Sequence, residues 1–408
     1  MFDRISLKFG DLGELFDGPH ATPQRTDVGP YFLNISSLVD GRLDLTQSDH
    51  VSPEEFAQWT RRVTPQEGDL LFSYETRLGD AALMPPGLIA CLGRRMALLR
   101  PYRDVVDPAF LLYFYISPEF KGVIEKHTIH GATVNRIGLS SMGSWPISVP
   151  ALEDQRAIAE VLGAIDKKIS ANRKAVDLLS QLARAKWLQA ALSAESVPLG
   201  TVVEVGLSGV WGEDSCTETA TVEVLALRGR DLEDLARRRE VTPPRRWITP
   251  VQAQRRIQKH SLEIWTAGSG SHLGPTLLIT PGVREAFDLP VVYSNFVKRL
   301  VPISGREDLL PSAWFAMLLE WERRGFENFK SGTAFPNLDV GAMLAGVSVP
   351  MLVGEQLLQV KTWADTLLRG ELLDENRTLA ATRDALLPQL MSGKLRVTDA
   401  EKVLEGVL

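Results

Sequence analysis

The feature that most constrains the fold of this 408-residue chain is a repeat at about half its length. The stretch HGATVNRIGLSSMGSWPISVPALEDQ (130–155) is echoed by SGTAFPNLDVGAMLAGVSVPMLVGEQ (331–356). Downstream of both, the Asn-Arg dipeptide at 172–173 aligns with the one at 376–377. Self-similarity at one offset is typical of a repeated architecture. The chain is therefore predicted to consist of two copies of one structural plan.

The echo extends upstream, more faintly, through further pairs of segments. They are 70–83 with 264–278, 108–124 with 312–329, and 7–18 with 197–209. Each half is therefore expected to be a globular module followed by one long helix. The predicted boundaries are globular modules at 1–150 and 195–350, helical segments at 151–194 and 351–392, and a C-terminal tail at 393–408.

Short β-branched or alternating runs bounded by Gly and Pro predict strands within the modules. These runs are DLLFS (69–73), RMALLR (95–100), PISVP (146–150), VEVLALR (222–228), TLLIT (276–280) and VKRLVPI (297–303). The apolar spacing around 110–124 and 314–329 predicts helices, and their aromatic residues are interpreted as core. The predicted fold class is α+β.

An apolar seam runs along the first long helix in steps that alternate between four and three residues. This heptad spacing is typical of a helix that packs along its length on another helix. The seam residues are Ile158, Leu162, Ile165, Ile169, Asn172, Val176 and Leu179 in the first helix, and Leu368, Leu372, Asn376, Leu379 and Leu386 in the second. The simplest partner for each helix is the other, which predicts an antiparallel coiled coil. Two core helices of separate domains are the alternative.

The ends and the register of these helices can also be predicted. Each seam carries an asparagine, and a buried polar residue in a seam fixes the register of pairing. Forty residues of helix span ~60 Å, so the pair would hold the modules apart. Pro388 should kink or shorten the second helix, and Gly393 is expected to stop it.

The charge of the chain is unevenly spread. Its net charge is −6, yet between Arg237 and His260 seven arginines and one lysine accompany a single acid, Glu240. Local basic density matters more than the total for phosphate contact. Cys91 and Cys216 form no CxxC pair, which fits a reducing compartment. With no apolar signal core and no membrane-length apolar run, a cytoplasmic location is expected.

Catalytic constellations are absent from the sequence. It contains no GxxxxGK[ST] phosphate loop, no HExxH and no Asn-Pro-Pro-aromatic tetrapeptide, and its scattered histidines predict no metal site. Two spaced modules without chemistry indicate a reader of two DNA half-sites. A structural or protein-interaction scaffold of the same architecture is the main alternative, and an enzyme with an unrecognised site is a third.

Several motifs resemble one known family. They are ISVPALEDQRAIAEVLGAIDKKISANRKAVDLLSQLARAKW (147–187), GDLLFS (68–73), GATVNRI (131–137) and RDALLPQLMSGKLRV (383–397). Together they resemble the DNA specificity subunit of type I restriction-modification systems. The second half keeps Glu355-Gln356 and Asn376-Arg377 but lacks the isoleucine-rich core of the central motif.

The resemblance implies two target recognition domains and two helical regions that pair as an antiparallel coiled coil. It implies a non-catalytic subunit that binds an asymmetric, two-part target on double-stranded DNA. It further implies two adenine methyltransferase subunits and motor-nuclease subunits as partners. AdoMet, ATP and magnesium would then belong to those partners, and no cofactor to this chain.

Candidate DNA contacts follow from side-chain chemistry, since arginine can read guanine edges, asparagine can read adenine, and lysine and threonine more often position the backbone. In the first module they are Tyr74, Thr76, Arg77, Arg94, Arg95, Thr133, Asn135 and Arg136. In the second they are Arg237, Arg238, Arg239, Arg245, Arg246, Arg255, Arg256, Lys259, Ser271, His272 and Lys330. For each arginine taken singly, a solvated or salt-bridged surface role is the alternative.

Overall fold

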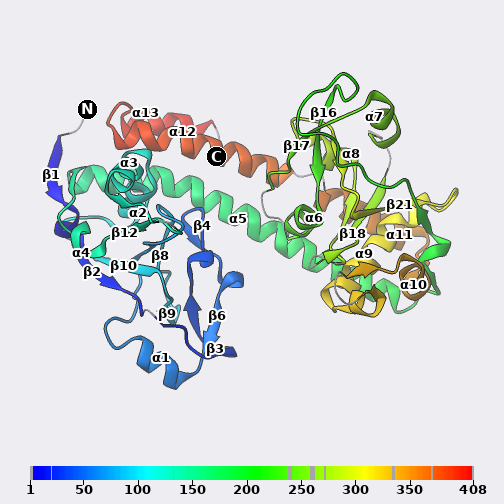
Figure 1. Ribbon diagram of the computed structural model, residues 1–408, viewed down its shortest axis with the longest axis horizontal. Helices are drawn as coiled ribbons and strands as arrows, with labels where there is room; N and C mark the ends of the chain where they lie inside the picture. Colours follow the sequence, from blue (N-terminus) through cyan, green and yellow to red (C-terminus); the bar gives the residue numbers. More distant parts are fainter. Residues whose placement is uncertain are drawn as a thin grey trace. The chain divides into compact units, whose positions relative to one another are not determined.

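The chain folds as two compact units (Figure 1). Unit 1 comprises Met1–Ala171 and Asn376–Leu408, and unit 2 comprises Asn172–Glu375. Helices α5 (Leu152–Ala191) and α12 (Glu371–Met391) contribute residues to both units. The computed structural model describes residues 3–19, 21–131, 133–237, 241–257, 262–270, 273–332, 336–368 and 371–406, without the side chains of 365–368 and 371–374.

Unit 1 is built on a four-stranded antiparallel sheet. Its strand order is β2 (Gly13–Asp17), β10 (Met96–Pro101), β7 (Leu70–Ser73) and β8 (Ala81–Leu83). A second sheet pairs β3 (Arg25–Leu33) antiparallel with β6 (Asp49–Val51) and parallel with β9 (Ala90–Leu92). Two-stranded ribbons join β1 (Arg4–Lys8) to β13 (Pro146–Pro150), β4 (Leu38–Val39) to β5 (Arg42–Leu43), and β11 (Thr128–Ile129) to β12 (Arg136–Ile137). Its shorter helices are α1 (Pro53–Trp59), α2 (Pro108–Ile116), α3 (Pro118–His127), α4 (Leu139–Met142) and α13 (Val397–Glu405).

Unit 2 repeats this topology. Its antiparallel sheet has the order β15 (Val203–Val205), β21 (Val297–Pro302), β18 (Glu263–Ala267) and β19 (Thr276–Ile279). Its mixed sheet pairs β16 (Val222–Leu227) antiparallel with β17 (Arg245–Ile248) and parallel with β20 (Val291–Tyr293). Ribbons join β14 (Ser196–Pro198) to β24 (Ser348–Pro350) and β22 (Lys330–Ser331) to β23 (Asn337–Leu338). The helices are α6 (Gly229–Ala236), α7 (Pro250–Arg256), α8 (Pro281–Glu285), α9 (Leu310–Glu322), α10 (Val340–Gly346) and α11 (Gly354–Leu368). The predicted repeat and the α+β class are confirmed.

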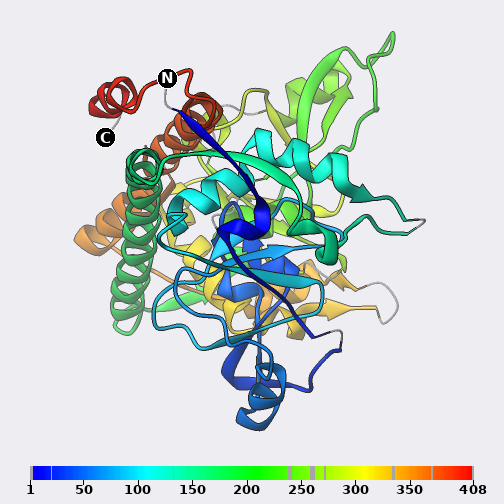
Figure 2. The ribbon, with the colours of Figure 1, turned by 90° about the vertical axis from the view of Figure 1, so that its left-hand side faces the viewer.

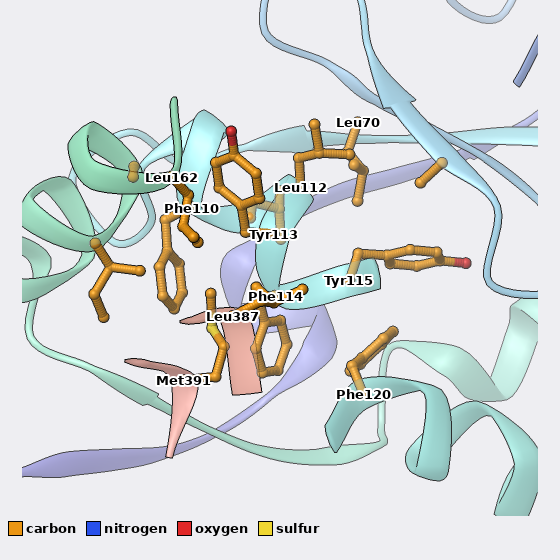
Figure 3. Packing of buried hydrophobic residues seen from close by; sticks show 14 of the residues in the cluster. Leu70, Phe110, Leu112, Tyr113, Phe114, Tyr115, Phe120, Leu162, Leu387 and Met391 are labelled. Atoms are coloured by element: carbon orange, nitrogen blue, oxygen red, sulfur yellow. The ribbon is translucent and has the colours of Figure 1, made fainter. Parts of the chain in front are cut away.

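Helix α2 lies at the centre of the unit 1 core because nearly all of its residues are apolar. The carboxylate of Asp107 caps its N-terminus by accepting hydrogen bonds of 2.9 and 3.0 Å from amides of the first turn, and every residue from Phe110 to Tyr115 is buried. Figure 3 shows these side chains packed beside Leu162 of α5 and Leu387 of α12. The aromatic-rich stretch is therefore core, as predicted.

The seam of α5 is buried over most of its length. Its buried members are Ile158, Leu162, Ile165, Ile169, Asn172 and Val176. Leu179 is instead 40% exposed and lies outside the buried stripe, contrary to the prediction. From Val176 the stripe takes a second four-residue step to Ser180 and continues through the buried Ala183 and Trp187. A strict heptad drifts ~20° per repeat on a straight helix, and an extra four-residue step offsets that drift.

The two long helices run antiparallel, as predicted. Arg383 Nη1 of α12 lies 3.0 Å from Asp166 Oδ1 of α5. Further along α5, Asn172 Nδ2 donates a 2.7 Å hydrogen bond to Glu375 Oε2, which comes earlier in α12. Figures 1 and 2 both show α12 alongside α5.

The end of α12 differs in part from the prediction. Its seam residues Asn376, Leu379 and Leu386 are buried, whereas Leu368 and Leu372 lie outside the described side chains. The helix continues through Pro388 to Met391, and Gly393 follows with φ +69°, the left-handed conformation that commonly ends a helix. The segment expected as a tail contains α13, which buries Ala400 and Leu404 in the unit 1 core.

Asp166 joins three elements of unit 1 to α5. Its carboxylate accepts a 2.7 Å hydrogen bond from the Tyr113 hydroxyl of α2 and a 2.9 Å bond from Arg42 Nη2 of β5, in addition to the contact with Arg383. Burial, followed by the nearby Asp166 charge, raises the pKa of Tyr113, so this phenol stays a donor. Asp166 therefore fixes the module against the paired helices within unit 1.

Gln155 makes a second joint at the start of α5. It is buried, and its side-chain amide donates to the carbonyl oxygens of Pro150 at 2.9 Å and Val105 at 3.2 Å. Its side-chain oxygen accepts a 3.0 Å bond from the backbone amide of Asp107. The repeat-equivalent residue Gln356, at the start of α11, is exposed.

Candidate nucleic-acid interface

Three loop segments meet at one edge of unit 1. They are the loop after β7 (74–77), the turn before β10 (93–95) and the arm of the β11–β12 hairpin at 133–137, and together we call them the unit 1 loop cluster. The amide of Tyr74 donates to the carbonyl of Arg95 at 3.1 Å, and the amide of Ile137 donates to the carbonyl of Tyr74 at 2.8 Å. Hydrogen-bonded segments lie about 4.8 Å apart, so the outer two are roughly 10 Å from each other.

This arrangement brings together candidate residues that are distant in sequence. The amide of Thr76 also donates to the carbonyl of Asn135 at 3.1 Å, and Glu75 forms a β-bridge with Arg136. The hairpin extends outward from the body of unit 1 (Figure 2). All eight candidates of the first module therefore belong to the unit 1 loop cluster. They are Tyr74, Thr76, Arg77, Arg94, Arg95, Thr133, Asn135 and Arg136.

The backbone of the cluster is strained at two positions. Thr76 has φ +69° and Arg95 has φ +72°, a left-handed conformation that residues with a Cβ seldom adopt. Such residues cost of order 1–3 kcal/mol each and gather at functional sites. Half of the four left-handed non-glycine residues in the described part of the chain thus lie in this one cluster.

The side chains of the cluster divide into anchored and outward-facing groups. Arg77 donates to the carbonyl oxygens of Ile35 and Leu38, both at 3.0 Å, and pairs with Asp80 at 2.6 Å. Arg95 Nε lies 3.1 Å from Glu75 Oε2. Tyr74 is buried, and that burial, followed by the Glu75 charge, raises its pKa. These three side chains hold the loops in place.

The outward-facing group comprises Arg94, Arg136, Thr133 and Asn135, which are all exposed. Within the described residues neither Arg94 nor Arg136 forms an ion pair or a side-chain hydrogen bond. Asn135 Oδ1 lies 3.3 Å from His130 Nδ1. Two uncommitted guanidinium groups beside an exposed amide and hydroxyl suit the donor and acceptor edges of bases and the phosphate backbone.

The arginine-rich stretch of unit 2 is less available for contact with DNA than its charge suggests, because several of its side chains have partners within the protein. Arg237 pairs with Glu233 at 3.1 Å and lies over the Trp321 ring. Arg245 lies 2.7 Å from Asp288.

Arg246 and Arg256 also bind partners within unit 2. Arg246 is only 8% exposed, donates to the carbonyl oxygens of Trp211 (3.2 Å) and Gly212 (2.9 Å), and pairs with Asp214. Arg256 donates to the Ser208 carbonyl at 3.0 Å. The expectation of one open basic patch is therefore wrong for these side chains, because partners distant in sequence occupy them.

The remaining candidates of unit 2 are scattered. Arg255 is exposed and has no ion pair among the residues that the structure places. Lys330, on β22, lies 3.3 Å from Glu327. Arg238, Arg239, Lys259, Ser271 and His272 lie outside the described residues.

The described residues also bear on metal binding and on membrane crossing. Over the described ranges, no three His, Cys, Asp or Glu side chains come together as metal ligands could. Within the same ranges, no helix combines the length and the apolar character that a bilayer crossing requires.

Comparisons with known proteins agree on one class, the DNA specificity components of restriction-modification systems. Residues 41–178 match the family model described as the type I restriction modification DNA specificity domain. A curated protein of Methanocaldococcus jannaschii, provisionally assigned as the specificity subunit of type I restriction enzyme MjaX, is 26% identical over 177 residues. That match covers 40% of each chain, so this chain spans well under half of the relative's length.

The fold has a solved counterpart. The type I restriction-modification S subunit from M. genitalium aligns with a TM-score of 0.53 and 14% identity over 96% of both chains. At that identity the likeness shows the fold alone. Residues 41–178 thus match the type I restriction modification DNA specificity domain, this chain is similar to specificity subunits of such systems, and the resemblance seen in its motifs is confirmed.

Proposed function

We propose that this chain is the non-catalytic DNA sequence-specificity subunit of a type I restriction-modification complex. Each unit would read one half of a two-part target on double-stranded DNA. The observation that carries the proposal is the repeat of the fold in two units, the first of which presents exposed Arg94, Asn135 and Arg136 on a strained, fixed backbone. Arginine and asparagine are the side chains that pair bidentately with guanine and adenine.

The long helices would set the distance between the half-sites. Helix α5 has 40 residues, which corresponds to ~60 Å at 1.5 Å per residue. In this proposal the antiparallel pairing with α12 serves as a spacer in place of a flexible linker. The proposal therefore predicts a target with two defined halves and a gap of fixed length.

The chemistry would belong to partner subunits in the cytoplasm. We propose that two adenine methyltransferase subunits carry AdoMet, and that motor-nuclease subunits carry ATP and magnesium. In that scheme Arg94, Asn135 and Arg136, the exposed residues of the unit 1 loop cluster, position and select DNA and take no part in bond making.

The test is a map of adenine methylation in a host without its own adenine methyltransferase. The full chain is expressed with its methyltransferase subunit, and each is also expressed alone. The expected result is methylation at one split motif only when both are present. Methylation without sequence preference, or binding of the joint complex to any duplex equally, would instead support the scaffold.

A further inference from the structure

Unit 2 contains a loop cluster built by the same backbone contacts as the unit 1 loop cluster. The amide of Gly268 donates to the carbonyl of Phe296 at 2.8 Å, as Tyr74 does to Arg95. The amide of Leu338 donates to the carbonyl of Gly268 at 2.9 Å, as Ile137 does to Tyr74. We call residues 268–270, 294–296 and 336–338 the unit 2 loop cluster.

Two further contacts fix the correspondence residue by residue. The amide of Gly270 donates to the carbonyl of Pro336 at 2.9 Å, and Ser269 forms a β-bridge with Asn337. The same pair of contacts links the 75–76 loop to 135–136 in unit 1. Gly270 has φ +74° where Thr76 has φ +69°, so the left-handed turn is kept, in unit 2 without strain because glycine has no Cβ.

The chemistry of the two clusters differs although their backbones correspond. The counterparts of Arg94, Arg95 and Arg136 are Asn295, Phe296 and Asn337. Asn295 and Asn337 are exposed, and Phe296 is 57% exposed. Amides and an aromatic ring therefore stand in unit 2 where unit 1 has guanidinium groups.

Unit 2 has a cation, Lys298, beside its loop cluster, in place of the arginines of unit 1. Lys298 lies on β21 directly opposite Thr266, and its stem crosses the face of Gly268, because a Cβ on that glycine would lie 2.8 Å from Lys298 Cγ and Cε. In unit 1 the equivalent positions hold Ala97 and Tyr74. The glycine thus makes room for a lysine stem against the cluster, where unit 1 has a tyrosine.

We propose that Asn295, Phe296, Asn337 and Lys298 are the specificity and phosphate-contacting residues of unit 2, and that its half-site is read through A·T pairs. Asparagine recognises the adenine N6 and N7 edge, an apolar ring contacts the thymine methyl, and lysine contacts phosphate. The half-site of unit 1, read by Arg94 and Arg136, contains a G·C pair. This inference rests on the proposed function, and it assigns the second half-site to the loop cluster and not to the arginine-rich stretch at 237–256.

The experiment uses the full chain with its methyltransferase subunit and maps methylation for five variants. Asn295→Ala and Asn337→Ala should each relax one A·T position of one half-site by about 5- to 150-fold. Lys298→Ala should weaken binding to all sequences and lower the salt slope by about one, with the motif unchanged. Arg94→Gln should relax a G·C position in the other half-site only.

Arg255→Ala is the matched control, because this exposed arginine lies in the arginine-rich stretch and outside both clusters. It should leave base preference unchanged in both halves. Thermal melting of each variant identifies any loss of fold, and the lysine variant supplies a second readout should an asparagine variant prove unstable.

The outcomes separate this inference from the proposed function. A wild-type complex that methylates no split motif would overturn both. A normal split motif that survives both asparagine variants, or that changes in the same half as with Arg94→Gln, would overturn the inference alone. A change of base preference in Arg255→Ala would do the same.

Discussion

Replacing Asp166 by alanine should loosen unit 1 more than any exposed charge substitution. The change removes the acceptor for the Tyr113 hydroxyl (2.7 Å), Arg42 (2.9 Å) and Arg383 (3.0 Å) at once. The Asp166 and Arg383 side chains are 21% and 14% exposed, so solvent screens this ion pair only partly. Tyr113 and Arg383 would be left largely buried without this partner.

The magnitude follows from those contacts. A hydrogen bond to a charged group contributes about 1.5–3 kcal/mol, and bonds that share one acceptor are not additive. Breaking a buried ion pair costs about 3–5 kcal/mol, but Arg383 keeps Asp384 at 2.8 Å. We therefore expect a loss of about 3 kcal/mol, which for a unit of this size lowers the melting temperature by roughly 6–12 °C.

The assay is thermal unfolding of the full chain, with hydrogen exchange of the α2 amides to identify the transition of unit 1. Asp384→Ala is the matched control, because that carboxylate is 64% exposed and also pairs with Arg383; it should cost under about 1 kcal/mol. Asp166→Asn, which keeps an acceptor oxygen, should fall between the two. Equal melting temperatures for Asp166→Ala and Asp384→Ala would refute the role assigned to Asp166.

Four further predictions concern other parts of the chain. Arg246→Ala should destabilise unit 2 by about 2–4 kcal/mol, because its buried guanidinium serves backbone carbonyls; an unchanged melting curve with a lower salt slope of DNA binding would show a phosphate contact instead. Thiol titration of the native protein should find Cys216 reactive and Cys91 protected, since burial raises the pKa of Cys91 to about 12 from 9.0. Because unfolding releases that thiol's proton at a lower pH, Cys91 should make stability fall as pH rises from about 9 to 12, and a Cys91→Ala variant should lack that part of the slope. Adding one heptad to each long helix, ~10.5 Å, should lengthen the gap in the methylated motif by about three base pairs with both half-sites kept, and an unchanged gap would contradict the spacer.

The fold was largely predictable because its signals are periodic. The strand runs and most of the α5 seam depend on neighbours close in sequence, and the half-chain repeat is visible directly as two similar segments; the structure confirms all three. The prediction for Leu179 was wrong because a straight helix drifts relative to a strict heptad, and this drift accumulates over several repeats. A strict alternation of four- and three-residue steps therefore points to Leu179, whereas the buried stripe passes through Ser180.

The candidate site was predictable only in unit 1. Side-chain chemistry pointed to Arg94, Asn135 and Arg136, but the sequence could not show that Arg77 is anchored to the distant carbonyl oxygens of Ile35 and Leu38. In unit 2 the high local charge predicted a basic patch, but Arg245 and Arg246 pair with carboxylates from other parts of the fold. The sequence did not predict a role for Lys298, because its position against the loop cluster depends on the lack of a side chain at Gly268, thirty positions earlier in the sequence.

The two joints between modules and helices differ in the glutamine at the start of the helix, which is buried in α5 and exposed in α11. Hydrogen bonds from Gln155 connect the first turn of α5 to Pro150, Val105 and Asp107. In unit 1 the module and the start of its helix are therefore expected to move as one rigid body. Exposed Gln356 provides no such tie at the start of α11, whose first turn can fray by itself. Amide protons near 152–156 should therefore exchange only when unit 1 opens as a whole, while those near 354–358 exchange early. Under the proposed function, strain that bound DNA places on the protein would be absorbed at the second joint and transmitted at the first.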